Sequence, residues 1–199
     1  RDGDNVSSIA AHMNDSGLRM KACNALQLSN TAEARAALRD ALSNSEGLFT
    51  LALIDSLGML HDDSAALRAR LEDKDPLVRA RAMRALAWTG DPNLIAPSRK
   101  IIGSASKETY FEAADAYFRL SDAVLRNGGR FDRAMDLYAW ALEHLKGNVL
   151  KGAAIAALGR SGDERVLAWI MNSVSETENG ELDHAALEAF ALLRGRVID

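Results

Sequence analysis

Residues 75–91 read DPLVRARAMRALAWTGD, and residues 147–163 read GNVLKGAAIAALGRSGD. Both stretches place an apolar pair early, a cation directly after it, an Ala-Leu pair near the end and Gly-Asp at the close. Their apolar residues recur every three or four positions, which is the spacing of one face of a helix. The two stretches therefore predict a helical unit that occurs more than once in the chain.

Weaker copies of this template occur at residues 15–26, 45–57, 107–118 and 181–190. The residue at the leucine position of the Ala-Leu pair, called the anchor here, is in successive copies Leu26, Leu57, Leu86, Phe118, Leu158 and Phe190. Successive anchors are 31, 29, 32, 40 and 32 residues apart. A period near 30 residues is typical of stacked helical hairpins, because a hairpin of this length cannot bury its apolar face without a neighbour.

Turn residues and a second amphipathic segment follow the copies of the template. The stop and cap are Ser29-Asn30-Thr31 after the first copy and, less clearly, His61-Asp62-Asp63 after the second. Gly90 can adopt the left-handed conformation that ends a helix, Asp91 can cap the next helix, and Pro92 suits its first position. The predicted second helices cover residues 31–43, 64–73, 92–103, 130–145 and 163–175. The chain therefore predicts an all-α fold of five helical hairpins, arranged as an α-solenoid.

Both ends of the chain predict incomplete repeats. Residues 5–14 are interpreted as the second helix of a hairpin that begins before Arg1, and residues 181–194 as a first helix whose partner lies beyond Asp199. We therefore expect a single repeat domain over residues 1–199 that belongs to a longer protein. Exposed terminal repeats also leave self-association open.

The fourth repeat, at about residues 106–145, departs from the pattern. It contains the 40-residue spacing between anchors, and the segment SDAVLRNGG at 121–129 contains a helix stop and a turn. Residues 129–144 resemble a helix of a tetratricopeptide repeat as much as they resemble the other helices predicted in this chain. We expect a kink or a bulging loop in this part of the chain.

The template resembles the bacterial HEAT-like repeat, also called the phycobilisome-lyase-type HEAT repeat. An Asp four residues before an Arg, an Ala three residues later, and then Ala-Leu and Gly-Asp carry the resemblance. The best match is residues 75–103, followed by 147–175 and, more weakly, 15–43. The resemblance implies a right-handed superhelix, with first helices on the convex side and second helices on the concave side.

Composition limits the classes of partner. Apolar residues make up 48% of the chain and aromatic residues 6%, a balance rich in Ala and Leu that favours helices. The net charge of -4 argues against nucleic acid and anionic membranes, and no apolar run is long enough to span a bilayer. The single cysteine, Cys23, is expected to be buried. The sequence favours the cytoplasm, and a periplasmic or secreted location stays open if a signal has been removed.

The residue pattern favours binding over catalysis. The four histidines lack metal-ligand spacing, and the sequence contains neither a glycine-rich phosphate loop nor a nucleophile elbow. We therefore predict no catalytic, metal or cofactor residues, and a scaffold that holds a protein or peptide on its concave second helices. One alternative is a phycobilin lyase or isomerase subunit that handles a chromophore. A HEAT-like nucleic-acid reader is the other, and the acidic net charge argues against it.

Six residues are candidates for partner binding: Trp140, Arg133, His144, Leu137, Arg99 and Arg68. On a helical wheel Trp140 lies opposite the apolar stripe, and Arg133, Leu137 and His144 are its neighbours there. An aromatic residue in that position is either covered by local structure or open to a partner, and both alternatives remain. Arg68 and Arg99 lie on predicted second helices.

The remaining conspicuous residues have structural interpretations. Asp75 with Arg79, and Asp15 with Arg19, are expected to combine a helix cap with a cation that packs across to the adjacent repeat. The cation-rich stretch at residues 68–84 contains interleaved acids and no aromatic residue, so an ion-paired surface is expected there. Trp88 is expected to pack under its turn, and Trp169 to seal the edge against the next repeat.

Overall fold

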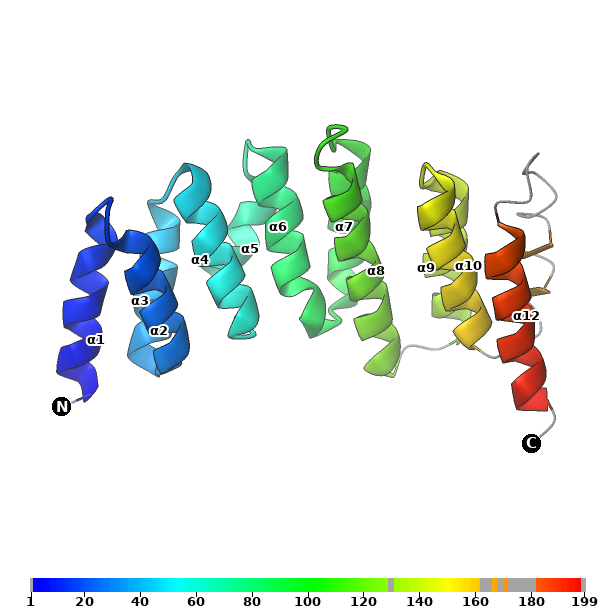
Figure 1. Cartoon of the computed structure of the whole chain (residues 1–199), viewed down its shortest axis with the longest axis horizontal. Coiled ribbons are helices and arrows are strands. Elements are labelled where there is room, and N and C mark those ends of the chain that lie inside the picture. The colour runs from blue at the N-terminus through cyan, green and yellow to red at the C-terminus, as the bar shows by residue number, and fades with distance from the viewer. Residues whose placement is uncertain (1, 129–130, 162–165, 168–169, 172–181, 198–199) are drawn as a thin grey trace. The chain divides into compact units, whose positions relative to one another are not determined.

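The computed structural model describes residues 2–128, 131–161, 166–167, 170–171 and 182–197. The elements in these ranges are all helices, and no strand occurs among them, which confirms the all-α prediction (Figure 1). The chain divides into two compact units, Arg1–Val124 and Leu125–Asp199. Their boundary falls within the fourth repeat, where the sequence predicts an irregularity. In the described part of the chain, no helix combines the length and apolar character needed to cross a bilayer.

The first unit consists of helical hairpins. Its elements are α1 (Asp2–Ala11), η1 (His12–Asn14), α2 (Arg19–Ser29), α3 (Ala32–Ser43), α4 (Gly47–Met59), α5 (Ala65–Ala69), η2 (Arg70–Glu72), α6 (Pro76–Leu86), η3 (Ala87–Thr89), η4 (Pro92–Leu94), α7 (Ile95–Gly103) and α8 (Tyr110–Arg126), the last of which contains the unit boundary. The first helices α2, α4 and α6 pack side by side, and the second helix α3 packs on α5 (Figure 1). These hairpins therefore contact their neighbours through like elements, and α3 also packs against α4 of the next hairpin.

Two of the predicted turns form as expected. Asn30 (φ 50°) and Gly90 (φ 59°) adopt the left-handed conformation that ends the preceding helical segment. The side chains of Thr31 and Asp91 each accept a hydrogen bond from a backbone N–H in the first turn of the following element, at 3.2 and 2.9 Å. These turns reverse the chain between the two helices of a hairpin.

The turn between α4 and α5 differs from the prediction. We expect Asp62 and Asp63 to cap the second helix, but the side chain of Ser64 does so, by accepting a hydrogen bond from the backbone N–H of Leu67 at 3.4 Å. Asp62, two residues before Ser64, is buried, and its Oδ1 accepts a hydrogen bond from the backbone N–H of Ser64 at 2.9 Å. The other carboxylate oxygen, Oδ2, is bound by Arg39 from the preceding hairpin.

Of the two acidic residues expected to cap a helix, Asp75 does so and Asp15 does not. Asp75 accepts a hydrogen bond from the N–H of Leu77 at 2.8 Å and so caps α6. Asp15 instead accepts from the N–H of Gly17 at 2.7 Å, within the loop that precedes α2. The predicted cap at Asp15 is wrong, because α2 begins only at Arg19.

The anchor leucines form the core of each unit. Leu26, Leu57 and Leu86 are fully buried in the first unit, and Leu158 is fully buried in the second. Each such burial contributes about 1.5–3 kcal/mol relative to an exposed side chain. Phe118 occupies the same repeat position but is only half-buried. The anchor position therefore holds hairpins together most tightly where it is leucine.

A glycine next to the anchor allows close helix packing in both units. A Cβ on Gly58, the residue after the anchor of α4, would lie 2.9 Å from the Cβ of Ala85 on α6. In the second unit, a Cβ on Gly159 would lie 2.6 Å from the Cα and Cβ of Ala189. In each case the alanine directly precedes the next anchor, so the same packing register recurs.

The second unit is built from α9 (Phe131–His144), α10 (Asn148–Ser161) and α12 (Asp183–Val197). The central helix α10 packs against both α9 and α12. Its buried residues include Ala154, Ile155 and Leu158. The predicted helix at 163–175, with Trp169 and the turn at 162–163, lies almost wholly outside the described residues.

Candidate partner-binding surface

Two arginines on second helices join neighbouring hairpins. Arg39 of α3 donates from Nε to Oδ2 of Asp62 at 2.8 Å, and its Nη2 bonds to the same oxygen. Arg68, in α5, donates from Nη2 to Oδ2 of Asp91 at 3.1 Å. Both pairs span 23 residues and end at the turn of the next hairpin. The repeated Arg–Asp pair therefore fixes the register between hairpins.

The surroundings of both carboxylates keep them ionised. Burial acts to raise the pKa of Asp62, but hydrogen bonds from Arg39 and Ser64 outweigh it and hold the pKa below its ordinary value. The pKa of Asp91 is lowered mainly by a hydrogen bond from the backbone N–H of Asn93, with a further contribution from Arg68. These anions therefore hold their arginines in place at neutral pH.

The sequence candidates Arg68 and Arg99 are engaged within the first unit. Arg68 also donates from Nε to Oδ1 of Asp63 at 2.6 Å, so its guanidinium bridges two carboxylates. Arg99 of α7 donates from Nη2 to the hydroxyl of the fully buried Tyr117 at 3.2 Å, and its Cζ lies 5.9 Å from the centre of that ring. Both arginines hold neighbouring elements together, which reduces what they can offer a partner.

The template's cation also reaches across hairpins. The Cζ of Arg19 on α2 lies 5.2 Å from the centre of the Phe49 ring on α4. Arg79 on α6 donates to the backbone carbonyl of Asp73 at 2.8 Å and to the Oγ of Ser104 at 3.2 Å. The structural interpretation of this position as a packing cation is therefore confirmed in these two copies.

The four candidate binding residues on α9 differ in how far they are exposed. The rings of Trp140 and His144 stack with centroids 4.8 Å apart and planes 9° apart, and Trp140 is half-buried while His144 and Arg133 are exposed. Leu137 is buried, so its predicted place on that surface is wrong. A helix in a repeat stack is buried over more than one face, which a single apolar stripe on a helical wheel does not represent.

The first helices of the first unit, and η3 after one of them, carry several exposed apolar side chains. These are Met20, Leu28, Leu48, Met59, Trp88 and Phe111. In the described second helices α3, α5 and α7, no large apolar side chain is exposed. Isolated exposed apolar residues are normal, whereas exposed apolar residues that form one contiguous patch indicate an interaction surface. The sequence prediction, which favours the second helices, did not identify this set.

Three of these residues occupy one position of the repeat and are called the first-helix stripe here. Leu28, Met59 and Trp88 each lie two residues after their anchor, and their exposed fractions are 83%, 72% and 40%. Trp88 stacks on His61, with ring centroids 4.9 Å apart and planes 17° apart. The prediction that Trp88 packs under its turn is therefore wrong, because its ring packs against a surface histidine. A shared position after each anchor is the sequence signal that could have found the stripe.

A cleft between α4 and α6, called the α4–α6 cleft here, adjoins the stripe. It encloses about 430 Å³. Its lining residues are Asp55, Gly58, Met59, His61, Arg84, Ala85, Trp88 and Arg119. The cleft thus combines exposed apolar walls with arginines from two helices.

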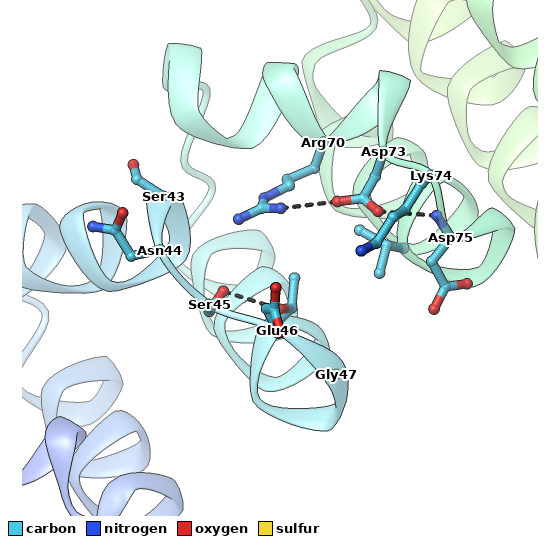
Figure 2. A pocket seen from close by; sticks show the side chains of 11 residues that line it. Ser43, Asn44, Ser45, Glu46, Gly47, Arg70, Asp73, Lys74 and Asp75 are labelled. Carbon is cyan, nitrogen blue, oxygen red and sulfur yellow. Dashed lines mark hydrogen bonds and ion pairs between the residues drawn. The ribbon is translucent and has the colours of Figure 1, made fainter.

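A second cleft lies where the loops that join successive hairpins meet, and it encloses about 530 Å³ (Figure 2). Arg70 and Asp73 form an ion pair at 2.8 Å on one side of it, and Thr50 donates to Ser45 at 3.0 Å on the other. Arg70 also donates to the backbone carbonyl of Leu42, in the preceding hairpin. The bond from Arg70 to Leu42 joins two hairpins at this cleft, so we assign the cleft a structural role.

The described residues contain no group of three or more His, Cys, Asp and Glu side chains placed to hold a metal ion. The comparisons with known proteins add no assignment to these surfaces. No known protein family matches the chain, and no curated protein shows significant similarity to it.

Proposed function

We propose that the protein is a non-catalytic scaffold of the HEAT-like repeat type, a right-handed α-solenoid of about five hairpins that binds a protein or peptide. The recurring packing supports this proposal. The Arg39–Asp62 and Arg68–Asp91 pairs have the same sequence separation, and glycine meets alanine at the same repeat position in both units. Stacked repeats of this kind offer extended surfaces for partners.

The observation that carries the binding role is the first-helix stripe. Large apolar side chains exposed in a row remain in water at a cost unless a partner covers them. Methionine and tryptophan, which the stripe contains at positions 59 and 88, are enriched at binding surfaces. We therefore place the docking surface of the first unit on the first helices rather than on the second helices that the sequence favours.

In the second unit, the stacked Trp140 and His144, with Arg133 nearby in sequence, are proposed as a further contact region. A half-buried indole supported by a second ring loses little conformational freedom when a partner covers it. Arg133 would add a charged contact at the rim of this region.

A displayed library of random peptides tests the binding role. Peptides selected on the folded chain are synthesised with a fluorophore, and their dissociation constants are measured by fluorescence anisotropy. Two variants are compared: a stripe variant, Leu28→Ser with Met59→Ser, and a second-helix variant, Ala36→Glu with Ala65→Glu, whose native alanines are exposed. We expect binding to weaken about tenfold or more in the stripe variant alone. Failure to select any peptide that needs the folded chain would refute the proposal.

A further inference from the structure

We propose that the α4–α6 cleft binds a short acidic peptide segment, taking an apolar side chain of that segment between Met59 and Trp88 while Arg84 and Arg119 bind its carboxylate. This inference rests on the proposed function and names the partner chemistry of one site. The cleft lies entirely within the first unit.

The floor of the cleft is formed where α4 and α6 approach closely, with only small residues at the contact. Gly58 has no Cβ, and Ala85 opposite it has only a methyl group. A larger residue at position 58 would fill this floor. The space above it is therefore a consequence of the same glycine that sets the helix spacing.

The walls of the cleft are apolar and exposed. Met59 closes one side, and its flexible thioether can adapt to different partner side chains. On the other side, the indole of Trp88 is held by its stack on His61, so little rotamer freedom remains to be lost on binding. A rigid aromatic opposite an adaptable methionine is a combination suited to an aliphatic or aromatic anchor side chain.

The charges at the cleft favour an acidic partner. Arg84 and Arg119 are 44% and 61% exposed, and Asp55, the acid in the lining, is already bound to Arg81 at 2.7 Å. Glu112, the acid nearest to Arg84, lies 3.7 Å away and is also bound by Arg81. The cleft therefore presents two cations outward in a chain whose net charge is -4.

A partner carboxylate can take over these arginines at little cost. Arg119 is paired at 2.7 Å with Asp115 on its own helix, and both side chains are exposed. Exposed pairs of this kind contribute only about 0–1 kcal/mol. Exchanging one exposed carboxylate for another, next to an apolar contact that excludes water, strengthens the interaction with the peptide.

The distance along the first-helix stripe indicates how long a bound peptide segment needs to be. Packed helices lie about 8–10 Å apart, so Leu28 on α2 and Trp88 beyond α6 are separated by roughly 20 Å. An extended chain covers that distance in about six residues. A short linear segment therefore suffices to contact the cleft and to reach the neighbouring helix.

The test uses peptides of about 12 residues, long enough to exceed that span, displayed on phage and selected on the folded chain. We expect enrichment of sequences that place Asp or Glu within a few residues of Leu, Met, Phe or Trp. For the selected peptides, Met59→Ser and the double variant Arg84→Glu with Arg119→Glu should each raise the dissociation constant about tenfold or more. Leu48→Ser is the matched control, since Leu48 is 80% exposed on α4 but outside the cleft.

Charge reversal separates a specific contact from damage to the fold. When the acidic residues of a selected peptide are changed to Lys, the double variant Arg84→Glu with Arg119→Glu should bind that peptide more tightly than the original chain does. Far-UV circular dichroism confirms that each variant is folded. Enriched peptides without acids, or acidic peptides that bind the arginine variant equally well, would overturn the inference.

Other outcomes distinguish the inference from the proposed function. Peptides that lose binding only in the second-helix variant Ala36→Glu with Ala65→Glu would overturn the cleft assignment and leave the scaffold function standing. No selectable peptide on any face would overturn both. Sedimentation velocity tests whether the cleft binds a second copy of the chain. Self-association of the original chain that is lost in Met59→Ser would show this and would overturn the inference.

Discussion

The close approach of α4 and α6 predicts that Gly58→Ala destabilises the first unit. The added methyl group would lie 2.9 Å from the Cβ and 3.1 Å from the Cα of Ala85. Carbon atoms pack favourably at about 3.5–4.0 Å, so the helices must separate by roughly 0.5–1 Å. The strain falls on backbone as well as side chain, which leaves few low-energy adjustments.

Two opposing terms set the size of the effect. Overpacking costs about 1–3 kcal/mol, while replacing glycine by alanine inside a helix contributes about 1 kcal/mol of stability. The expected net change for Gly58→Ala is therefore a loss of about 1 kcal/mol. Gly103→Ala is the matched control, because Gly103 ends α7 and a Cβ there meets no atom within 4 Å. The control should gain up to about 1 kcal/mol.

The two variants are compared by urea and thermal unfolding followed by far-UV circular dichroism. A difference of about 2 kcal/mol corresponds to roughly 4–8 °C in the melting temperature at this chain length. Adding Ala85→Gly to Gly58→Ala removes the closest atom and should recover part of the loss, which a double-mutant cycle measures. If Gly58→Ala stabilises the chain as much as Gly103→Ala does, the close-packing argument is wrong.

Three further predictions concern a second close helix contact, a buried carboxylate and the buried thiol. Gly159→Ala should cost about 2–3 kcal/mol, whereas Gly152→Ala, whose new methyl would lie 3.6 Å from its nearest neighbour, should cost little in the same unfolding assay. Asp62→Asn should cost about 1–2 kcal/mol at neutral pH, against less than about 1 kcal/mol for the exposed Asp115→Asn. The pKa of Asp62 is lower in the folded state than in the unfolded state, so its ionised carboxylate stabilises the fold at pH values above the ordinary carboxyl pKa. This stabilisation is lost as the pH falls through the pKa of the folded state. In urea titrations at decreasing pH, the free energy of unfolding of the wild type should therefore fall more steeply than that of Asp62→Asn. Cys23 is fully buried and burial raises its pKa, so Ellman's reagent should label it far more slowly in the folded chain than in urea; equal rates would place the thiol at the surface.

The sequence predicts most of the hairpin arrangement in the first unit because its signals are local. The period of the apolar residues places Leu26, Leu57 and Leu86 in the core, and a helix stop followed by a capping residue marks the turns at Asn30 and Gly90. These signals depend on residues a few positions apart. They do not require knowledge of which hairpin packs against which.

The surface was harder to predict, because exposure depends on what a neighbouring hairpin covers. Leu28, Met59 and Trp88 are apolar and lie close to their anchors, so a periodicity argument assigns such residues to the core. Leu137 illustrates the opposite error, because it is placed on a surface by the helical wheel but is covered in the structure. Arg68 could not be identified as a bridge, since Asp91 lies 23 residues away in sequence.

The first helices and the second helices of the first unit differ in how they contact their neighbours, and this difference supports the place proposed for a partner. Arginines on α3 and α5 bond to aspartates in the next hairpin, so the second helices use their polar groups to fix the register of the stack. First helices are also joined by Arg81, which bonds to Asp55 and Glu112, but their closest contact is made by the small residues Gly58 and Ala85. Two apolar side chains beside this contact remain exposed: Met59 at 72%, and Trp88 at 40% although its ring stacks on His61. The packing that joins α4 and α6 therefore also creates the cleft between Met59 and Trp88 in which we propose that a partner side chain binds.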